Sequence, residues 1–301
     1  MTNHQLPLDG ILIVDKPADW TSHDVVAKVR KICQTKRVGH TGTLDPFATG
    51  VLVICLNRAT RLVQFLTGED KEYLATIRFG FATDTGDLTG TPLTEPTATD
   101  HLKPNLIEEA LKSFRGRIQQ IPPMYSAKKI GGVKLYEMAR RGEEIERQPI
   151  AVEIKELELI GQIPGDSLFT IRVVSSAGTY IRTLAEDIGK ALGIGAHLQS
   201  LCRTRVGNCV LGQAVTLEQL AEISATGKLS DVLIPMAKSL LLPAVQINET
   251  EKGLVQHGRA VQREGQWLSG EKLKLVNNDE LIAIAEFNAA TKILQPKVVI
   301  A

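Results

Sequence analysis

The 301-residue sequence lacks most of the features that mark membrane, secreted and metal-binding proteins. Its most apolar run, Val51 to Leu56, is far too short to span a lipid bilayer. The four cysteines include no Cys-x-x-Cys spacing, which argues against a zinc site and indicates reduced packing residues. Met1 to Asp9 show no basic segment leading into an apolar stretch, so we expect no secretory signal, no membrane association and a cytoplasmic location.

The sequence also lacks a strong overall charge, internal repeats and low-complexity tracts. The formal net charge is +1, which by itself neither favours nor excludes a nucleic-acid partner. The charges are unevenly spread, however, because Lys112 to Arg147 hold nine Lys or Arg residues against four Glu. Such a basic face suits a polyanionic partner, although a solvated surface explains the excess equally well.

Apolar residues are plentiful enough for a real core. They make up 43% of the chain and charged residues 23%, which is ordinary for a soluble globular protein. Helical and strand patterns are interspersed without regular βαβ repetition, so we predict an α+β fold with a mixed or antiparallel sheet flanked by helices. Short β-like runs follow residue 244. We therefore predict a large domain over residues 1–240 and a small β-rich module over 241–301.

Local patterns predict several elements within the large domain. Thr21 and Asp24 form a capping-box pattern ahead of an apolar stripe, which predicts a helix from 21 to 32. A second helix is expected over 106–114 with Asn105 as its cap, and a third over 180–192. Strands are predicted at 51–56, 72–80, 150–160 and 167–174.

Asp45 is the first candidate for chemistry. It follows a loop with glycines at 39 and 42 and precedes Pro46, which restricts the backbone at the aspartate. Such a loop can present one carboxylate into a cleft as a nucleophile. It lacks the Gly-Lys-Ser/Thr ending of a phosphate-binding P-loop. An ordinary Asp-Pro turn before a strand explains the same spacing.

Two further side chains have open alternatives. Tyr73 lies on the apolar face of an alternating strand, where it is either a core residue or an aromatic that stacks on an extruded base. Arg182 falls in the first turn of the 180–192 helix, where the helix dipole prefers anions. It either pairs with Glu186 on the surface or reaches a distant carboxylate such as Asp45, whose pKa that pairing would keep below its usual range.

Several segments stand in order along the chain as a set of motifs: Asp15-Lys16-Pro17 with Thr21-Ser22-His23-Asp24, Gly39 to Leu52, Lys71-Glu72-Tyr73 with Thr83 to Asp87, Pro122 to Lys128, Gly178 to Arg182, and Leu201 to Gly207. Together they resemble the bacterial tRNA pseudouridine-55 synthases, the TruB family. The resemblance covers essentially the whole chain. Cys202, Arg61 and Phe47 depart from the residues common there, and none of these departures removes a presumed catalytic group.

The resemblance implies a pseudouridine-synthase domain, a C-terminal PUA-like module, and no cofactor or metal. It implies isomerisation of uridine 55 in the T loop of tRNA. In that interpretation Asp45 is the nucleophile, Arg182 orients it, and Tyr73 stacks on the flipped base and assists removal of the C5 proton. Leu201 lines the pocket and His40 fills the space that the base vacates. The other substrate-binding residues are Lys16, Gly42, Lys128 and Tyr180.

The resemblance also implies partners. We expect contact with the T arm and acceptor stem of tRNA and no guide RNA. We also expect a monomer, because no amphipathic seam stands out in the sequence. An RNA-binding or tRNA-folding protein with a vestigial catalytic loop is the alternative from another functional class. The guide-RNA-dependent synthases of archaea and eukaryotes are a second alternative, but the chain has no lysine-rich tails.

Overall fold

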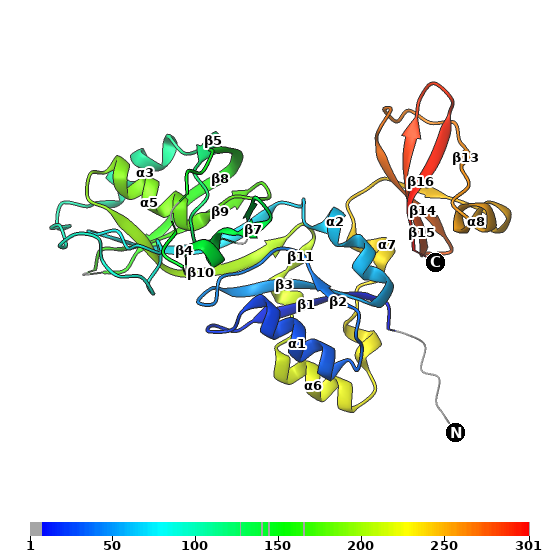
Figure 1. Cartoon of the computed structure of the whole chain (residues 1–301), viewed down its shortest axis with the longest axis horizontal. Coiled ribbons are helices and arrows are strands. Elements are labelled where there is room, and N and C mark those ends of the chain that lie inside the picture. The colour runs from blue at the N-terminus through cyan, green and yellow to red at the C-terminus, as the bar shows by residue number, and fades with distance from the viewer. Residues whose placement is uncertain (1–7, 127, 140, 144, 165, 301) are drawn as a thin grey trace.

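The computed structural model describes residues 8–300 except 127, 140, 144 and 165 (Figure 1). One large sheet runs through the first part of the chain. Among the strand pairs of this sheet that the described residues form, only β3 with β10 is parallel, so the predicted mixed, largely antiparallel α+β fold is confirmed. Its strand order is β1 (Gly10–Lys16), β3 (Thr49–Leu56), β10 (Ala196–Val206), β4 (Lys71–Phe79), β9 (Leu168–Ser175), β8 (Ile150–Gln162) and β5 (Gly116–Gln120), with β2 (Val38–His40) beside β3 and β11 (Cys209–Val210) beside β10.

The helices of this part cover the sheet in two groups. Helices α1 (Ser22–Ile32) and α6 (Leu217–Ala225) contribute to an apolar cluster with β1 and β3, and α3 (Pro104–Lys112) and α5 (Ile181–Ala191) to another with β4 and β9. Shorter elements complete the connections. These are α2 (Val63–Leu66), α4 (Leu135–Ala139), α7 (Met236–Ser239), the 3-10 helices η1 (Asn57–Leu62), η2 (Leu211–Gln213) and η3 (Leu229–Val232), and the hairpin of β6 (Lys129–Ile130) with β7 (Val133–Lys134).

Local capping explains where α1 begins. The Thr21 hydroxyl accepts from the amide of Asp24, whose carboxylate accepts from the amide of Thr21 at 3.0 Å, so the predicted capping box is confirmed. The predicted cap of α3 is wrong. That helix starts at Pro104 with Lys103 at the cap and no side-chain hydrogen bond, because a proline at the first helical position needs no donor partner.

Strand β3 is apolar from Val51 to Leu56, where both of its faces are covered. Leu52, Ile54 and Leu56 belong to the cluster beneath α1 and α6, whereas Val51 and Val53 belong to a cluster on the other face. The loop that leads into β3 therefore sits on a rigid, fully buried support.

The last part of the chain forms a second, five-stranded sheet, drawn at the upper right of Figure 1. One apolar cluster includes Val276, Leu281 and Ile300 from this part together with Ile11 and Val51 from the large sheet, so the two parts share a core. The predicted boundary at 240/241 remains a prediction. The elements are β12 (Ala244–Gln246), α8 (Glu249–Gln256), β13 (Val261–Gln262), β14 (Lys272–Asn277), β15 (Glu280–Asn288) and β16 (Ile293–Val299).

No helix among the described residues has the length and apolar character required to cross a membrane.

Candidate active site

Asp45 lies in the loop between β2 and β3, and neighbouring groups fix this loop on one side. The Ser22 hydroxyl accepts from the Leu44 amide at 2.9 Å and donates to the Leu44 carbonyl at 3.2 Å. Lys16 Nζ donates to the Pro46 carbonyl at 3.0 Å. The Ala48 amide donates to the Asp45 carbonyl at 3.1 Å. The backbone of the nucleophile candidate is therefore held on both sides of the residue.

Arg203 fixes the same loop from the opposite side, and sequence reasoning gave it no role. Its guanidinium is almost fully buried and donates through Nε to the Val51 carbonyl at 2.7 Å and through Nη2 to the Gly42 carbonyl at 3.1 Å. A hydrogen bond with the Tyr73 side chain adds a third partner. Gly42 has a φ of +103°, which disfavours any residue with a Cβ. Only contacts across the fold could have revealed this arginine.

Arg182 pairs with Asp45, although 137 residues separate them in the sequence. Its Nε lies 3.0 Å from Asp45 Oδ2, and its Nη2 lies 3.3 Å from Asp45 Oδ1. The guanidinium thus contacts both carboxylate oxygens, one through an ion pair and one through a hydrogen bond, which fixes the orientation of both groups. Of the two alternatives for Arg182, the pair with Asp45 is confirmed and no ion pair with Glu186 is present among the described residues.

The rest of the Arg182 guanidinium is also engaged. Nη1 donates to the Thr85 carbonyl at 2.9 Å and lies 3.6 Å from Asp87 Oδ2, and Nη2 donates to the Tyr125 carbonyl at 2.6 Å. Asp87 is nearly buried, and its Oδ1 accepts from the hydroxyl of Thr85 at 2.8 Å. Arg182 therefore lies between two aspartates. In the sequence Asp87 belongs to the family-like segment Thr83 to Asp87, but sequence reasoning assigned it no role.

The pKa of Asp45 is raised, contrary to the expectation from its arginine partner. Removal from bulk solvent is the largest cause, and Asp87 adds to it. Arg182 and Lys16 act in the opposite direction without cancelling the effect of burial. The Asp45 side chain retains 33% exposure, so it can still be reached from a cavity.

Two adjoining cavities meet at the Asp45–Arg182 pair. The first cavity has a volume of about 560 Å³ and is lined by His23, Phe47 and Asp87, among others. The second has a volume of about 300 Å³. Their shared lining is Thr43, Leu44, Asp45, Ser126 and Arg182, and the second cavity is further lined by Gly42, Tyr73, Lys128, Tyr180 and Leu201. Seven of the nine predicted site residues therefore line one cavity.

Tyr73 and Leu201 are core residues that also reach the second cavity. Both are more than nine-tenths buried and belong to the apolar cluster of β4, β9 and α5, yet both also line the second cavity. They come from the adjacent strands β4 and β10. Tyr180 is held through its backbone, because its amide and carbonyl bond the side-chain amide of Gln120 at 2.9 Å and 3.1 Å.

His40 and Lys16 line neither of these two cavities. The imidazole of His40 lies 5.7 Å from that of His23, edge to face, and burial lowers the pKa of His40. Lys16 is fully buried, and its Nζ donates to the carbonyls of Pro17, Trp20 and Pro46. Burial lowers its pKa to about 8. Backbone carbonyls thus occupy the Lys16 ammonium group, and its contact with substrate stays a prediction.

Surface pairing reduces the predicted basic excess between Lys112 and Arg147. Lys112, Arg115 and Arg141 each form an ion pair with a nearby glutamate. Arg140, another of the nine basic residues in this stretch, lies outside the described residues.

Among the described residues no group of three or more His, Cys, Asp or Glu side chains could hold a metal ion.

Comparison with known proteins identifies the family. Residues 30–181 match the model of the TruB family pseudouridylate synthase N-terminal domain, and residues 182–241 match the tRNA pseudouridylate synthase B C-terminal domain. The chain belongs to the TruB family. The tRNA pseudouridine synthase B of Solibacter usitatus is 46% identical over 253 residues, which are 84% of this TruB-family chain and 85% of the relative. That of Bacillus licheniformis is 39% identical over 292 residues, or 96% and 93% of the two chains.

Solved structures support the same fold for this TruB-family enzyme. A chain in an H/ACA RNP bound to a substrate RNA containing 2′-deoxyuridine is 26% identical, with a TM-score of 0.76 over 98% of this chain and 86% of that one. A chain in a Cbf5-Nop10-Gar1 complex is 27% identical, with a TM-score of 0.76 over 98% and 85%.

Proposed function

We propose that this enzyme isomerises uridine 55 in the T loop of tRNA to pseudouridine, with Asp45 as the nucleophile. The observation that carries the proposal is the Asp45–Arg182 pair at the mouth of a cavity walled by Tyr73 and Leu201. The carboxylate is fixed, partly exposed and adjacent to a surface that can hold a planar base. These are the properties that attack on a flipped nucleotide requires.

The reaction itself explains why the site needs few groups. Uridine and pseudouridine are isomers: the bond from N1 to C1′ breaks, a bond from C5 to C1′ forms, and the proton lost from C5 balances the one gained at N1. The Asp45 carboxylate either assists departure of uracil at the ribose carbon or adds to the base. The uracil then turns over within the cavity. No group has to be supplied from elsewhere, which agrees with the expected absence of a cofactor.

We assign stacking on the uracil to Tyr73, because it lines the second cavity and its hydrogen bond with Arg203 fixes the tyrosine side chain relative to Gly42. We assign removal of the C5 proton to Tyr73 or to Asp45 itself. Arg182 orients Asp45, and Lys16 holds the loop behind it. His40 remains our candidate for filling the space of the flipped base, together with its neighbour His23.

The substrate contacts outside the cavity follow from the family. We propose that the enzyme binds the T arm, and that the second sheet contacts the acceptor stem as a PUA-like module. The shared core between the two sheets would keep that module at a fixed distance from Asp45. The bacterial relatives suggest action on tRNA without a guide RNA. A monomer and a cytoplasmic location remain predictions.

A tritium-release assay tests the function. Unmodified tRNA carrying tritium at uracil C5 is incubated with the wild type and with Asp45→Asn, and tRNA binding is measured alongside. We expect release by the wild type, no release by the variant, and similar tRNA binding by both. Equal release would remove Asp45 from its role. Binding without release by either protein would favour the tRNA-binding alternative.

A further inference from the structure

Ser126 carries a buried hydroxyl that the mechanism above does not use. The residue is 6% exposed, and its Oγ has no hydrogen-bond partner among the described residues. Buried hydroxyls are normally paired, since an unpaired one is unfavourable. An unpaired hydroxyl in a binding cavity is therefore a group reserved for a ligand.

The position of Ser126 distinguishes it from the other hydroxyls of this kind. Thr41 and Ser175 also bury a hydroxyl without a partner among the described residues, but neither lines the two cavities. Ser126 lines both and shares this property with Asp45 and Arg182. It thus lies at the boundary between the cavities, beside the nucleophile.

The backbone around Ser126 is fixed relative to the nucleophile. The carbonyl of the preceding residue, Tyr125, accepts from Arg182 Nη2 at 2.6 Å, and the same nitrogen contacts Asp45. The Ser126 amide donates to the Met124 carbonyl at 2.9 Å, which closes a tight turn. The hydroxyl is therefore presented to the cavity at a fixed place.

We propose that the Ser126 hydroxyl hydrogen-bonds the ribose 2′-hydroxyl of the target nucleotide. Tyr73 and Leu201 line only the second cavity, so the base lies there and its bond to C1′ lies toward Asp45. The 2′-hydroxyl is on the carbon next to C1′, and it is the free ribose hydroxyl of a nucleotide within an RNA chain. A serine hydroxyl both donates and accepts, which suits a hydroxyl partner. Ser126 would thereby distinguish RNA from DNA at the target.

This proposal rests on the proposed function, and paired substrates test it. Two T-arm RNA hairpins differ only in uridine or 2′-deoxyuridine at the target position, and equilibrium binding of each is measured. We expect the wild type to prefer the ribose hairpin by about fivefold, the effect of one net hydrogen bond. Turnover does not disturb the comparison, because the product keeps its 2′-hydroxyl. Ser126→Ala should bind both hairpins equally.

Ser175→Ala is the matched control, because it removes a buried, unpaired hydroxyl outside the two cavities. It should keep the wild-type preference. The proposal is overturned if Ser126→Ala keeps that preference, if it weakens both hairpins equally, or if the wild type shows none. Tritium release by the wild type separates these results from failure of the proposed function, which would abolish release whatever the binding ratio.

Discussion

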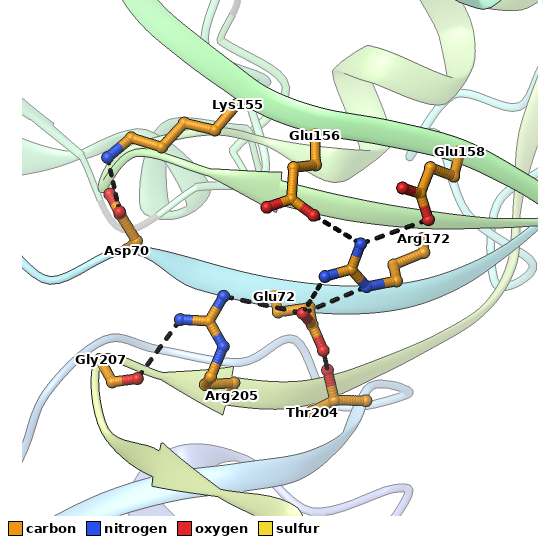
Figure 2. A network of polar contacts seen from close by, with 9 residues as sticks. All are labelled: Asp70, Glu72, Lys155, Glu156, Glu158, Arg172, Thr204, Arg205 and Gly207. Atoms are coloured by element: carbon orange, nitrogen blue, oxygen red, sulfur yellow. Dashed lines mark hydrogen bonds and ion pairs between the residues drawn. The ribbon is translucent and has the colours of Figure 1, made fainter.

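Two arginines in this enzyme are each surrounded by carboxylates, but in opposite environments. The Arg182 side chain is 6% exposed and lies between Asp45 and Asp87 in the active site. The Arg172 side chain is 28% exposed and contacts Glu72 and two further glutamates of β8 on the sheet (Figure 2). The comparison shows how burial affects the pKa of the carboxylates and how readily solvent replaces a lost partner.

The Arg172 network joins neighbouring strands of the large sheet. Glu72 of β4 accepts from Arg172 of β9 at 2.7 Å and from the Thr204 hydroxyl of β10 at 2.8 Å (Figure 2). Arg172 also reaches Glu156 at 2.6 Å. Glu72 alternates with Tyr73 along β4, so the network lies on the face opposite the cavity. Solvent competes with each of these contacts, and other partners remain when one is lost.

The Arg182 cluster is less open to solvent. The side chains of Arg182 and Asp87 are each 6% exposed, so water replaces a lost partner less readily there than at Arg172. The pKa of Asp45 is raised, mainly by burial, whereas the pKa of Glu72 is lowered. For Glu72, burial raises the pKa, but hydrogen bonds from Thr204 and Arg172 outweigh it. Burial thus dominates the pKa of Asp45, and hydrogen bonds dominate the pKa of Glu72.

Arg182→Met should have the largest effect. It leaves Asp45 and Asp87 without their shared cation, so we expect unfolding free energy to fall by about 3 kcal/mol, as for a broken buried pair. Tritium release should fall by roughly a thousandfold or more, because the nucleophile loses its orientation. Urea unfolding and single-turnover assays measure the two effects. Activity above a tenth of the wild-type rate would show that the pair is dispensable.

Asp87→Asn should have a smaller effect, since it keeps the size and one oxygen acceptor of the side chain. We expect roughly a tenfold loss of turnover, because Arg182 Nη1 is held less firmly. Asp87 contributes to the raised pKa of Asp45. The acid limb of the pH–rate profile should therefore shift to lower pH in this variant. An unshifted limb would mean that Asp87 does not act on the Asp45 carboxylate.

The two clusters should respond to pH with opposite signs. Asp45 has a raised pKa when folded, so its contribution to stability falls as pH rises above the ordinary value of 3.8. Glu72 has a lowered pKa, so its contribution is present above the ordinary value of 4.5 and is lost as pH falls through the folded pKa. Urea unfolding from pH 3 to about 7 in the wild type, Asp45→Asn and Glu72→Gln would separate the two. Equal slopes in both variants would contradict this comparison.

Arg172→Met should have the smallest effect. It removes exposed ion pairs, so we expect a loss of about 1 kcal/mol in unfolding free energy, reduced further by salt. Turnover at saturating tRNA should stay within about twofold of the wild type, since the cavity face of β4 is untouched. A large loss of turnover with normal stability would instead place the network in the mechanism.

The sequence predicted the features that depend on neighbouring residues. The capping box of Thr21 and Asp24 was found because its partners are three positions apart, and the apolar run of β3 was found because burial on both faces leaves no polar alternation. The cap of α3 was mistaken because Asn105 matched a local pattern, while Pro104 already satisfied the helix start. Two local patterns gave different first residues for this helix, and the sequence alone does not show which of the two applies.

The local sequence around Asp45 was compatible with an ordinary Asp-Pro turn. Only the family motifs around Asp45 indicated a catalytic role. The local pattern allowed Arg182 either partner, and only the fold placed it on Asp45 across 137 positions. Lys16 matched a family motif but proved to be a buried support. Arg203 and Asp87 had no local feature that distinguished them.

The sequence by itself therefore determined several of the helices and strands, the family and the identity of the nucleophile candidate, because capping, alternation and motif order are encoded between near neighbours. Only the tertiary structure decided which charges meet, how deeply they are buried and that the Ser126 hydroxyl has no hydrogen-bond partner among the described residues. The physical reason is that pairing and pKa depend on distance and solvent in three dimensions. Both are set by strands and loops that the chain brings together from positions far apart.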